Sequence, residues 1–190
     1  MAYCLGQLQD PLAIPVLISV VSDTTREPIV RHEAAEALGA IGGAEVVTVL
    51  EQFSSDPVPE VRDTCQLAMS KLRYQATQGD SVGSVNVYGS VDPAPPSKEQ
   101  DTAKLHAALL DETLPLFDRY RALFSLRNKA DDVSVKALAS GLNCTSALFR
   151  HEVAFVLGQV GTVQWDGFLS VCCAFNCFSG CLTLCCGRAS

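Results

Sequence analysis

At 190 residues and with a hydrophobic content of 48%, the chain can bury a core and is unlike a disordered protein. Its formal charge of -7 and pI near 4.9 argue against nucleic acid as a partner, because a nucleic-acid backbone selects a basic face. An acidic surface instead suits a basic protein or an amine substrate.

Cysteine usage and the N-terminus indicate a cytoplasmic protein with reduced thiols. Six of the nine cysteines lie between residues 172 and 186, whereas Cys4, Cys65 and Cys144 occur singly in helix-like stretches. This distribution does not resemble the disulfide framework of a small secreted domain. The opening MAYCLGQLQD has neither the basic start nor the long apolar run of a signal peptide.

In chain order, two kinds of segment alternate and predict a helical repeat. Apolar stretches occur at 12–21, 44–53, 103–111 and 133–142. Between them lie segments that align with one another at offsets of 31 or 32 residues, at 27–41, 58–72, 116–126 and 148–158. Each unit is therefore two helices in a little over thirty residues, which is the signature of an all-α solenoid.

The rhythm is interrupted once, and this interruption sets the predicted domains. Residues 75–100 are rich in glycine and serine and contain three prolines, which is typical of a linker. We therefore expect an N-terminal half at 1–74 whose first repeat is truncated and an incomplete C-terminal half at 101–161. Residues 162–190 match neither the repeat nor the linker and form a cysteine-rich tail.

A histidine followed by glutamate recurs in register in the two halves. The chain has three histidines, and two of them begin such a pair, in RHEAAEALGAIG at 31–42 and RHEVAFVLGQVG at 150–161. The pairs are His32 with Glu33 and His151 with Glu152, and the two histidines are 119 residues apart. The other aligned segments keep the repeat but lack the pair: the segment at 58–72, for example, has Asp63 and Thr64 at the positions of His32 and Glu33. The pair therefore occurs selectively.

The segment at 28–41 is predicted to be an amphipathic helix. At about 100° per residue its apolar side chains share one face, namely Val30, Ala34, Ala37, Leu38 and Ile41. His32, Glu33 and Glu36 fall on the opposite side, and the segment around His151 keeps the pattern. We therefore expect both pairs to project from packed helices toward open space, with Gly39 permitting close helix approach.

Imidazole and carboxylate side chains together suit a redox iron, because Fe(II) binds nitrogen and oxygen donors and open positions admit dioxygen. Two facing pairs are able to enclose two metals between the halves. The alternative is a solvated helix face on which histidine and glutamate are merely polar. His106, which has no adjacent carboxylate, is assigned no role.

The paired helices, the two His-Glu segments and the linker sequence SVDPAPP resemble the eukaryotic deoxyhypusine hydroxylase family over residues 1 to about 160. The resemblance implies a HEAT-repeat dyad whose halves clasp a non-haem centre of two Fe(II) ions. Such an enzyme uses dioxygen to hydroxylate the deoxyhypusine side chain of a translation initiation factor and so completes hypusine. The basic loop of that factor agrees with the acidic charge of the chain.

The resemblance also implies roles for individual residues. His32 and Glu33 match the second His-Glu motif of the family, and His151 and Glu152 match the third. His32, Glu33 and His151 are then expected to bind iron. Glu152 is expected either to bind metal or to contact the substrate amine, since a carboxylate serves both purposes.

The family has four such motifs, and this chain shows two. By alignment the first lies just before Met1, and the fourth is expected one repeat after His151, where the sequence leaves the pattern. We therefore expect weak iron binding and impaired hydroxylation. The alternative function is a non-catalytic HEAT-type module that holds a partner, such as the initiation factor itself.

The tail at 162–190 allows three interpretations. Its cysteines suit zinc but lack paired CxxC spacing and a nearby histidine, and residues 168–186 carry no charge but include polar residues that weaken a membrane span. We favour a replaced C-terminus with no metal or membrane role.

Overall fold

The computed structural model describes residues 1–78 and 88–161. These residues form helices and turns with no strand among them, which confirms the all-α prediction. The interpretations of the cysteine-rich tail lie outside the described residues. Within the described part, no helix combines the length and apolar character needed to cross a bilayer.

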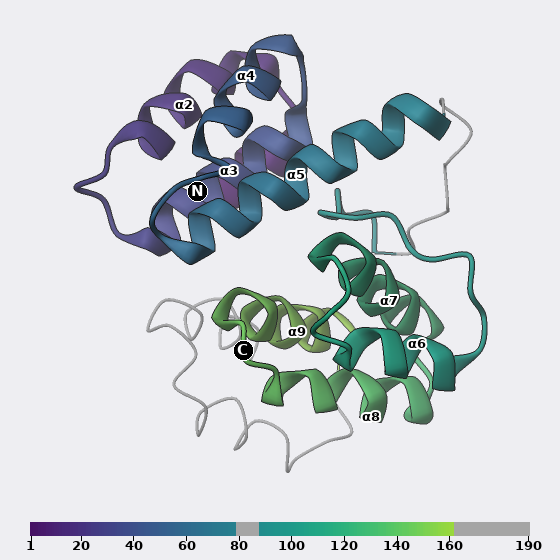
Figure 1. The fold of residues 1–190 in the computed structure, drawn as a ribbon. Coiled ribbons are helices and arrows are strands. Elements are labelled where there is room, and N and C mark those ends of the chain that lie inside the picture. The colour runs from purple at the N-terminus through teal and green to yellow at the C-terminus, as the bar shows by residue number, and fades with distance from the viewer. Residues whose placement is uncertain (79–87, 162–190) are drawn as a thin grey trace, which may run out of the picture.

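The helices form two groups, which Figure 1 shows as a purple-to-blue group and a green group. The first contains α1 (Ala2–Leu8), a short 3-10 helix (Pro11–Ala13), α2 (Ile14–Ser22), α3 (Pro28–Ile41), α4 (Ala44–Phe53) and α5 (Pro59–Gln78). The second contains α6 (Thr102–Leu110), α7 (Leu116–Lys129), α8 (Asp132–Ser140), a 3-10 helix (Gly141–Asn143) and α9 (Ala147–Gln159). Helix α5 runs past residue 75, so the predicted start of the linker is still helical.

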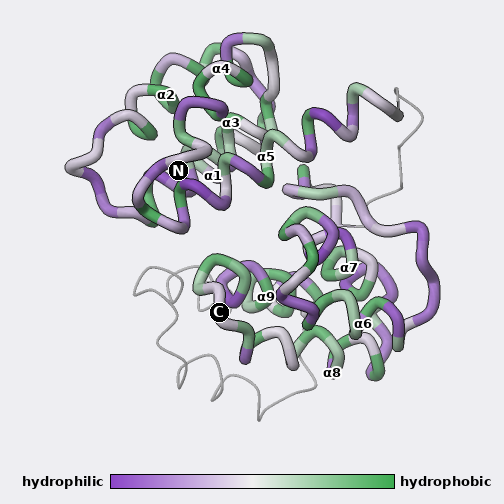
Figure 2. The backbone as a smooth tube through the Cα atoms, in the orientation of Figure 1, coloured by the Kyte–Doolittle hydropathy of each residue, from purple (hydrophilic) through white to green (hydrophobic). Residues whose placement is uncertain are grey.

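Each group has its own hydrophobic core. In the first, α3 packs against α1, α2 and α5, and in the second α7 packs against α6 and α8. Most helices carry both hydrophobic and hydrophilic stretches, as expected for elements with one buried face (Figure 2). The predicted close approach at Gly39 is confirmed, because a Cβ atom there would lie 2.6 Å from Cβ of Ala68 on α5.

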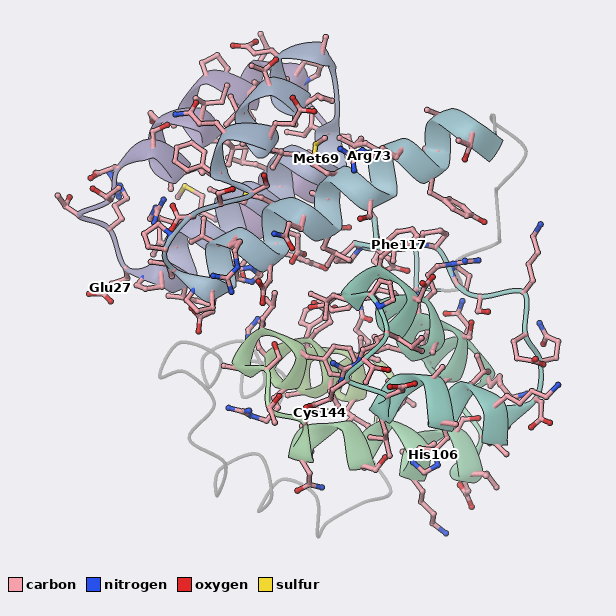
Figure 3. The ribbon with its side chains drawn as sticks, in the orientation of Figure 1. Glu27, Met69, Arg73, His106, Phe117 and Cys144 are labelled. Atoms are coloured by element: carbon pink, nitrogen blue, oxygen red, sulfur yellow. The ribbon has the colours of Figure 1, made fainter. Side chains whose placement is uncertain are left out.

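Helix α5 joins the two groups. It contacts both α7 and α9 of the second group. Near its C-terminal end, the ring of Tyr74 lies 5.7 Å from that of Phe117, and the Arg121 guanidinium stacks 4.8 Å from the Tyr74 ring. Figure 3 shows Phe117 at the top of α7, directly beneath α5.

The described part of the linker, residues 88–100, is anchored to both groups. The side-chain amide of Gln7 on α1 donates to the Val91 carbonyl at 3.2 Å and accepts from the Val91 N–H at 2.7 Å. One residue later, Asp92 receives two hydrogen bonds from the Arg127 guanidinium on α7, at 2.6 and 2.8 Å. Gln7 and Arg127 thus hold neighbouring linker residues from opposite sides.

The Asp92–Arg127 pair offers a test of how strongly the linker is held. Arg127 is fully buried, and removing one partner of a buried ion pair leaves the other charge without compensation. We expect Arg127→Met to lower the free energy of unfolding by about 3 kcal/mol. Lys104→Met, at the exposed pair with Glu99, is the matched control and should stay close to the parent chain in urea denaturation.

Candidate metal centre

Three of the four predicted site residues come together between the two helix groups. His32 and Glu33 lie on α3 and His151 lies on α9, and one ligand atom from each falls within 4.8 Å of the others. The Nε2 atoms of both histidines are 3.9 Å from Oε1 of Glu33. The two imidazole rings meet edge to face, with centroids 5.8 Å apart and planes at 88°.

Local sequence features fix the starts of the two helices that carry these residues. Pro28 occupies the first turn of α3, where its missing N–H costs no hydrogen bond, and the Arg31 guanidinium donates to the Val21 carbonyl and to Asp56. Ser146 caps the N-terminus of α9, where its hydroxyl accepts a hydrogen bond from the Phe149 N–H. Each histidine therefore lies about one turn into its helix, and α9 alone of the two has a side-chain cap at its N-terminus.

The prediction that the pairs project toward open space is wrong for Glu152, which is 4% exposed, and for His32. The His32 side chain is only 2% exposed, because α5 covers the face of α3 that looked polar in isolation, and His151 on α9 closes it from the other side. Conversely Val30, which was predicted to pack on the core face, is 40% exposed. The hydrophobic pattern of a single helix does not reveal that further helices, here α5 and α9, also cover it.

Burial sets the protonation states of the three residues. Desolvation, helped by the neighbouring His151, lowers the pKa of His32 to about 3, and desolvation also lowers the pKa of His151. Both rings are therefore neutral near pH 7, which is the form that binds metal. Desolvation raises the pKa of Glu33.

Two ring nitrogens in the cluster have no hydrogen-bond partner although they are buried. These are Nε2 of His32 and Nδ1 of His151. Buried polar atoms are nearly always satisfied, so the unsatisfied Nε2 of His32, which lies on the side of Glu33, points to a missing ligand. Two imidazoles with one carboxylate form the donor set of non-haem Fe(II) sites that keep open positions for dioxygen. The residues thus fit iron.

The fourth predicted residue, Glu152, does not join the three. It is 4% exposed, and its pKa is raised well above the usual value by desolvation and by the negative charges of Glu36, Asp92 and Glu33. The carboxyl group of Glu152 is therefore close to these acidic side chains, and the Arg127 guanidinium offsets their charges only in part. A cation bound nearby would stabilise the ionised form of Glu152.

A small cavity adjoins Glu33 between α1, α3, α5 and the linker. Its volume of about 10 Å³ is enough for about one water molecule. Glu36 and Lys71 line it together with Tyr3 and Thr64. Sequence reasoning placed Glu36 on the polar face and aligned Thr64 with Glu33, but it assigned neither a role.

Comparison with known proteins shows what the chain is similar to. A model described as HEAT repeats matches residues 1–70. The deoxyhypusine hydroxylase of Homo sapiens is 58% identical to this chain over 160 residues, and that of Danio rerio is 54% identical over 163 residues. Each match covers 84% of this chain and 53% of the relative. The solved structure of human deoxyhypusine hydroxylase in complex with glycerol matches with a TM-score of 0.81, 58% identity, 84% of this chain and 55% of that one.

The chain is a relative of the deoxyhypusine hydroxylases. The resemblance inferred from the two His-Glu segments is thereby confirmed, as is the HEAT-repeat fold. The chain spans about half the length of the deoxyhypusine hydroxylases it matches.

The raised pKa of Glu36 makes the stability of the fold depend on pH. Desolvation, then the charge of Glu33, raises the pKa of Glu36 to about 8, and Lys71 opposes the shift. Charged and titratable side chains from five elements surround Glu36. They are Glu33 on α3, Lys71 on α5, Asp92 in the linker, Tyr3 on α1 and Glu152 on α9.

Because native Glu36 keeps its proton to higher pH than the unfolded chain, its contribution to stability is full below about pH 4.5 and is lost as the pH rises to about 8. We expect Glu36→Gln to flatten the pH dependence of the unfolding free energy across this window in chelator-treated protein. Glu45→Gln, at an exposed position of α4, is the control. An unchanged slope in Glu36→Gln would show that another group causes it.

Proposed function

We propose that His32, Glu33 and His151 hold Fe(II) and that the chain is built for the dioxygen-dependent hydroxylation of deoxyhypusine on a translation initiation factor in the cytoplasm. The observation that carries the proposal is that His32, Glu33 and His151 each place a donor atom within 4.8 Å of the others. The two histidines are 119 residues apart in the sequence. The chemistry of the donors supports iron, and the name of the relatives supports the reaction. When bound, iron supplies the redox chemistry with dioxygen.

The chain's own residues hold and orient the reactants. The two neutral rings offer nitrogen lone pairs, and the Glu33 carboxylate supplies negative charge that offsets the charge of the metal. Glu152 is proposed to contact a protonated substrate amine or to bind a second metal, because either positive charge would favour the ionised carboxylate that burial disfavours. The formal charge of -7 favours approach of a basic protein loop.

A second candidate function is a HEAT-type binding module without chemistry, and histidine usage favours it for this chain alone. The chain contains three histidines, and His106 instead lies 2.8 Å from the Ser140 hydroxyl on the far side of the second group (Figure 3). Only two imidazoles are thus available for a centre that holds two irons in the family. We propose that iron binds weakly and that hydroxylation is impaired.

Metal binding is testable with Co(II), whose visible absorbance reports nitrogen and oxygen ligands. We expect one saturable Co(II) site per chain, and we expect His32→Ala or His151→Ala to abolish it because each variant removes a donor. His106→Ala is the matched control and should titrate like the parent chain. Equal binding by all three variants would refute the proposed site.

Hydroxylation is tested with the deoxyhypusine form of the initiation factor, iron, dioxygen and a reductant. We expect this chain to form at most a trace of hypusine, because the cluster supplies three protein ligands rather than two complete sets. A full-length deoxyhypusine hydroxylase is the positive control. Product formation by this chain at the rate of the control would contradict the proposed impairment.

A further inference from the structure

The side of His32 that faces away from the cluster contacts one hydroxyl group. Nδ1 of His32 lies 2.7 Å from Oγ1 of Thr64, which is buried on α5. The same hydroxyl lies 2.6 Å from the carbonyl oxygen of Glu60, one turn earlier in α5. Thr64 Oγ1 therefore makes two short contacts, one to a ring nitrogen and one to a carbonyl.

The number of protons decides the direction of these two hydrogen bonds. A threonine hydroxyl has one proton to donate, and a carbonyl oxygen has none. The 2.6 Å contact to Glu60 is a hydrogen bond only if Thr64 donates it, which is the common back-bonding of threonine in a helix. The contact to His32 must then be donated by Nδ1–H of the ring.

The other ring nitrogen of His32 supports the same assignment independently. Nε2 is buried without a hydrogen-bond partner, and Oε1 of Glu33 at 3.9 Å is too distant to accept one. A neutral imidazole carries a single ring proton, so a proton on Nδ1 leaves Nε2 with a lone pair. Nε2, which carries this lone pair, is the ring atom that faces Glu33 and His151.

We propose that Thr64 is a positioning residue that fixes the proton of His32 on Nδ1 and thereby presents Nε2 as the metal-binding nitrogen. The proposal rests on the proposed function in so far as it assigns that nitrogen to a metal. The Thr64 hydroxyl also sets the rotation of the ring, because the bond at Nδ1 and the lone pair at Nε2 share the ring plane. His151 differs, since its Nδ1 has no partner.

The proton position is measured directly in metal-free protein. With three histidines in the chain, ¹⁵N-labelled imidazoles can be assigned from single His→Gln variants, and long-range ¹H–¹⁵N spectra distinguish the two tautomers. We expect His32 to be the Nδ1–H tautomer in the parent chain and in Thr64→Ser. Thr64→Val should change the tautomer or mix the two forms. An Nε2–H ring in the parent chain would overturn the proposal without the need for any variant.

The consequence for metal binding is measured by Co(II) titration. Loss of an outer hydrogen bond to a ligating histidine typically costs 10- to 100-fold in metal affinity, so we expect Thr64→Val to bind Co(II) about 10- to 100-fold more weakly. Thr64→Ser keeps the hydroxyl and should restore parent affinity. The matched control is Thr48→Val at an exposed position of α4, because the Thr48 hydroxyl also donates to a carbonyl one turn earlier but contacts no histidine.

The two measurements separate this proposal from the proposed function. A parent chain that shows the Nδ1–H tautomer but binds no Co(II) would refute the metal site while supporting the role of Thr64 in placing the proton. Thr64→Val that folds by circular dichroism and keeps both the tautomer and the Co(II) affinity of the parent would overturn the proposal. Loss of affinity in Thr64→Ser as well as Thr64→Val would also overturn it, because the hydroxyl would then not be the cause.

Discussion

The meeting of His32 on α3 with His151 on α9 is the constraint on which the site depends. Each helix group contributes one histidine to the cluster, so neither group contains the donor set by itself. Helix α5 contacts α9, and the linker residues Val91 and Asp92 are held by Gln7 on one side and Arg127 on the other. These contacts bring two imidazoles that are distant in sequence to a centroid separation of 5.8 Å.

The space between the groups has the character of a functional site rather than of a packed core. A stable core has few unsatisfied polar atoms, yet here two ring nitrogens lack partners while Glu36 and Glu152 have raised pKa values. Burying carboxyl groups side by side destabilises the fold, and a bound cation would relieve that cost. The acidic interior and the imidazole pair therefore complement one another.

The repeat and its His-Glu pairs could be predicted from sequence, because a helical period and a recurring dipeptide are local patterns. The depth of His32 could not, since it depends on how α5 and α9 cover α3, and the same limitation led to Val30 being placed in the core. Thr64 was aligned with Glu33 as a position where the pair is absent. Its contact with His32 depends on the register between α3 and α5, which a repeat alignment does not contain.

The central claim is that His32, Glu33 and His151 bind one metal ion between the two helix groups. Anomalous diffraction from crystals of the chain soaked in Co(II) tests it most directly. We expect a single strong peak within bonding distance of Nε2 of His32, a ring nitrogen of His151 and a carboxylate oxygen of Glu33. Full occupancy elsewhere on the chain, with no peak between the two imidazoles, would contradict it.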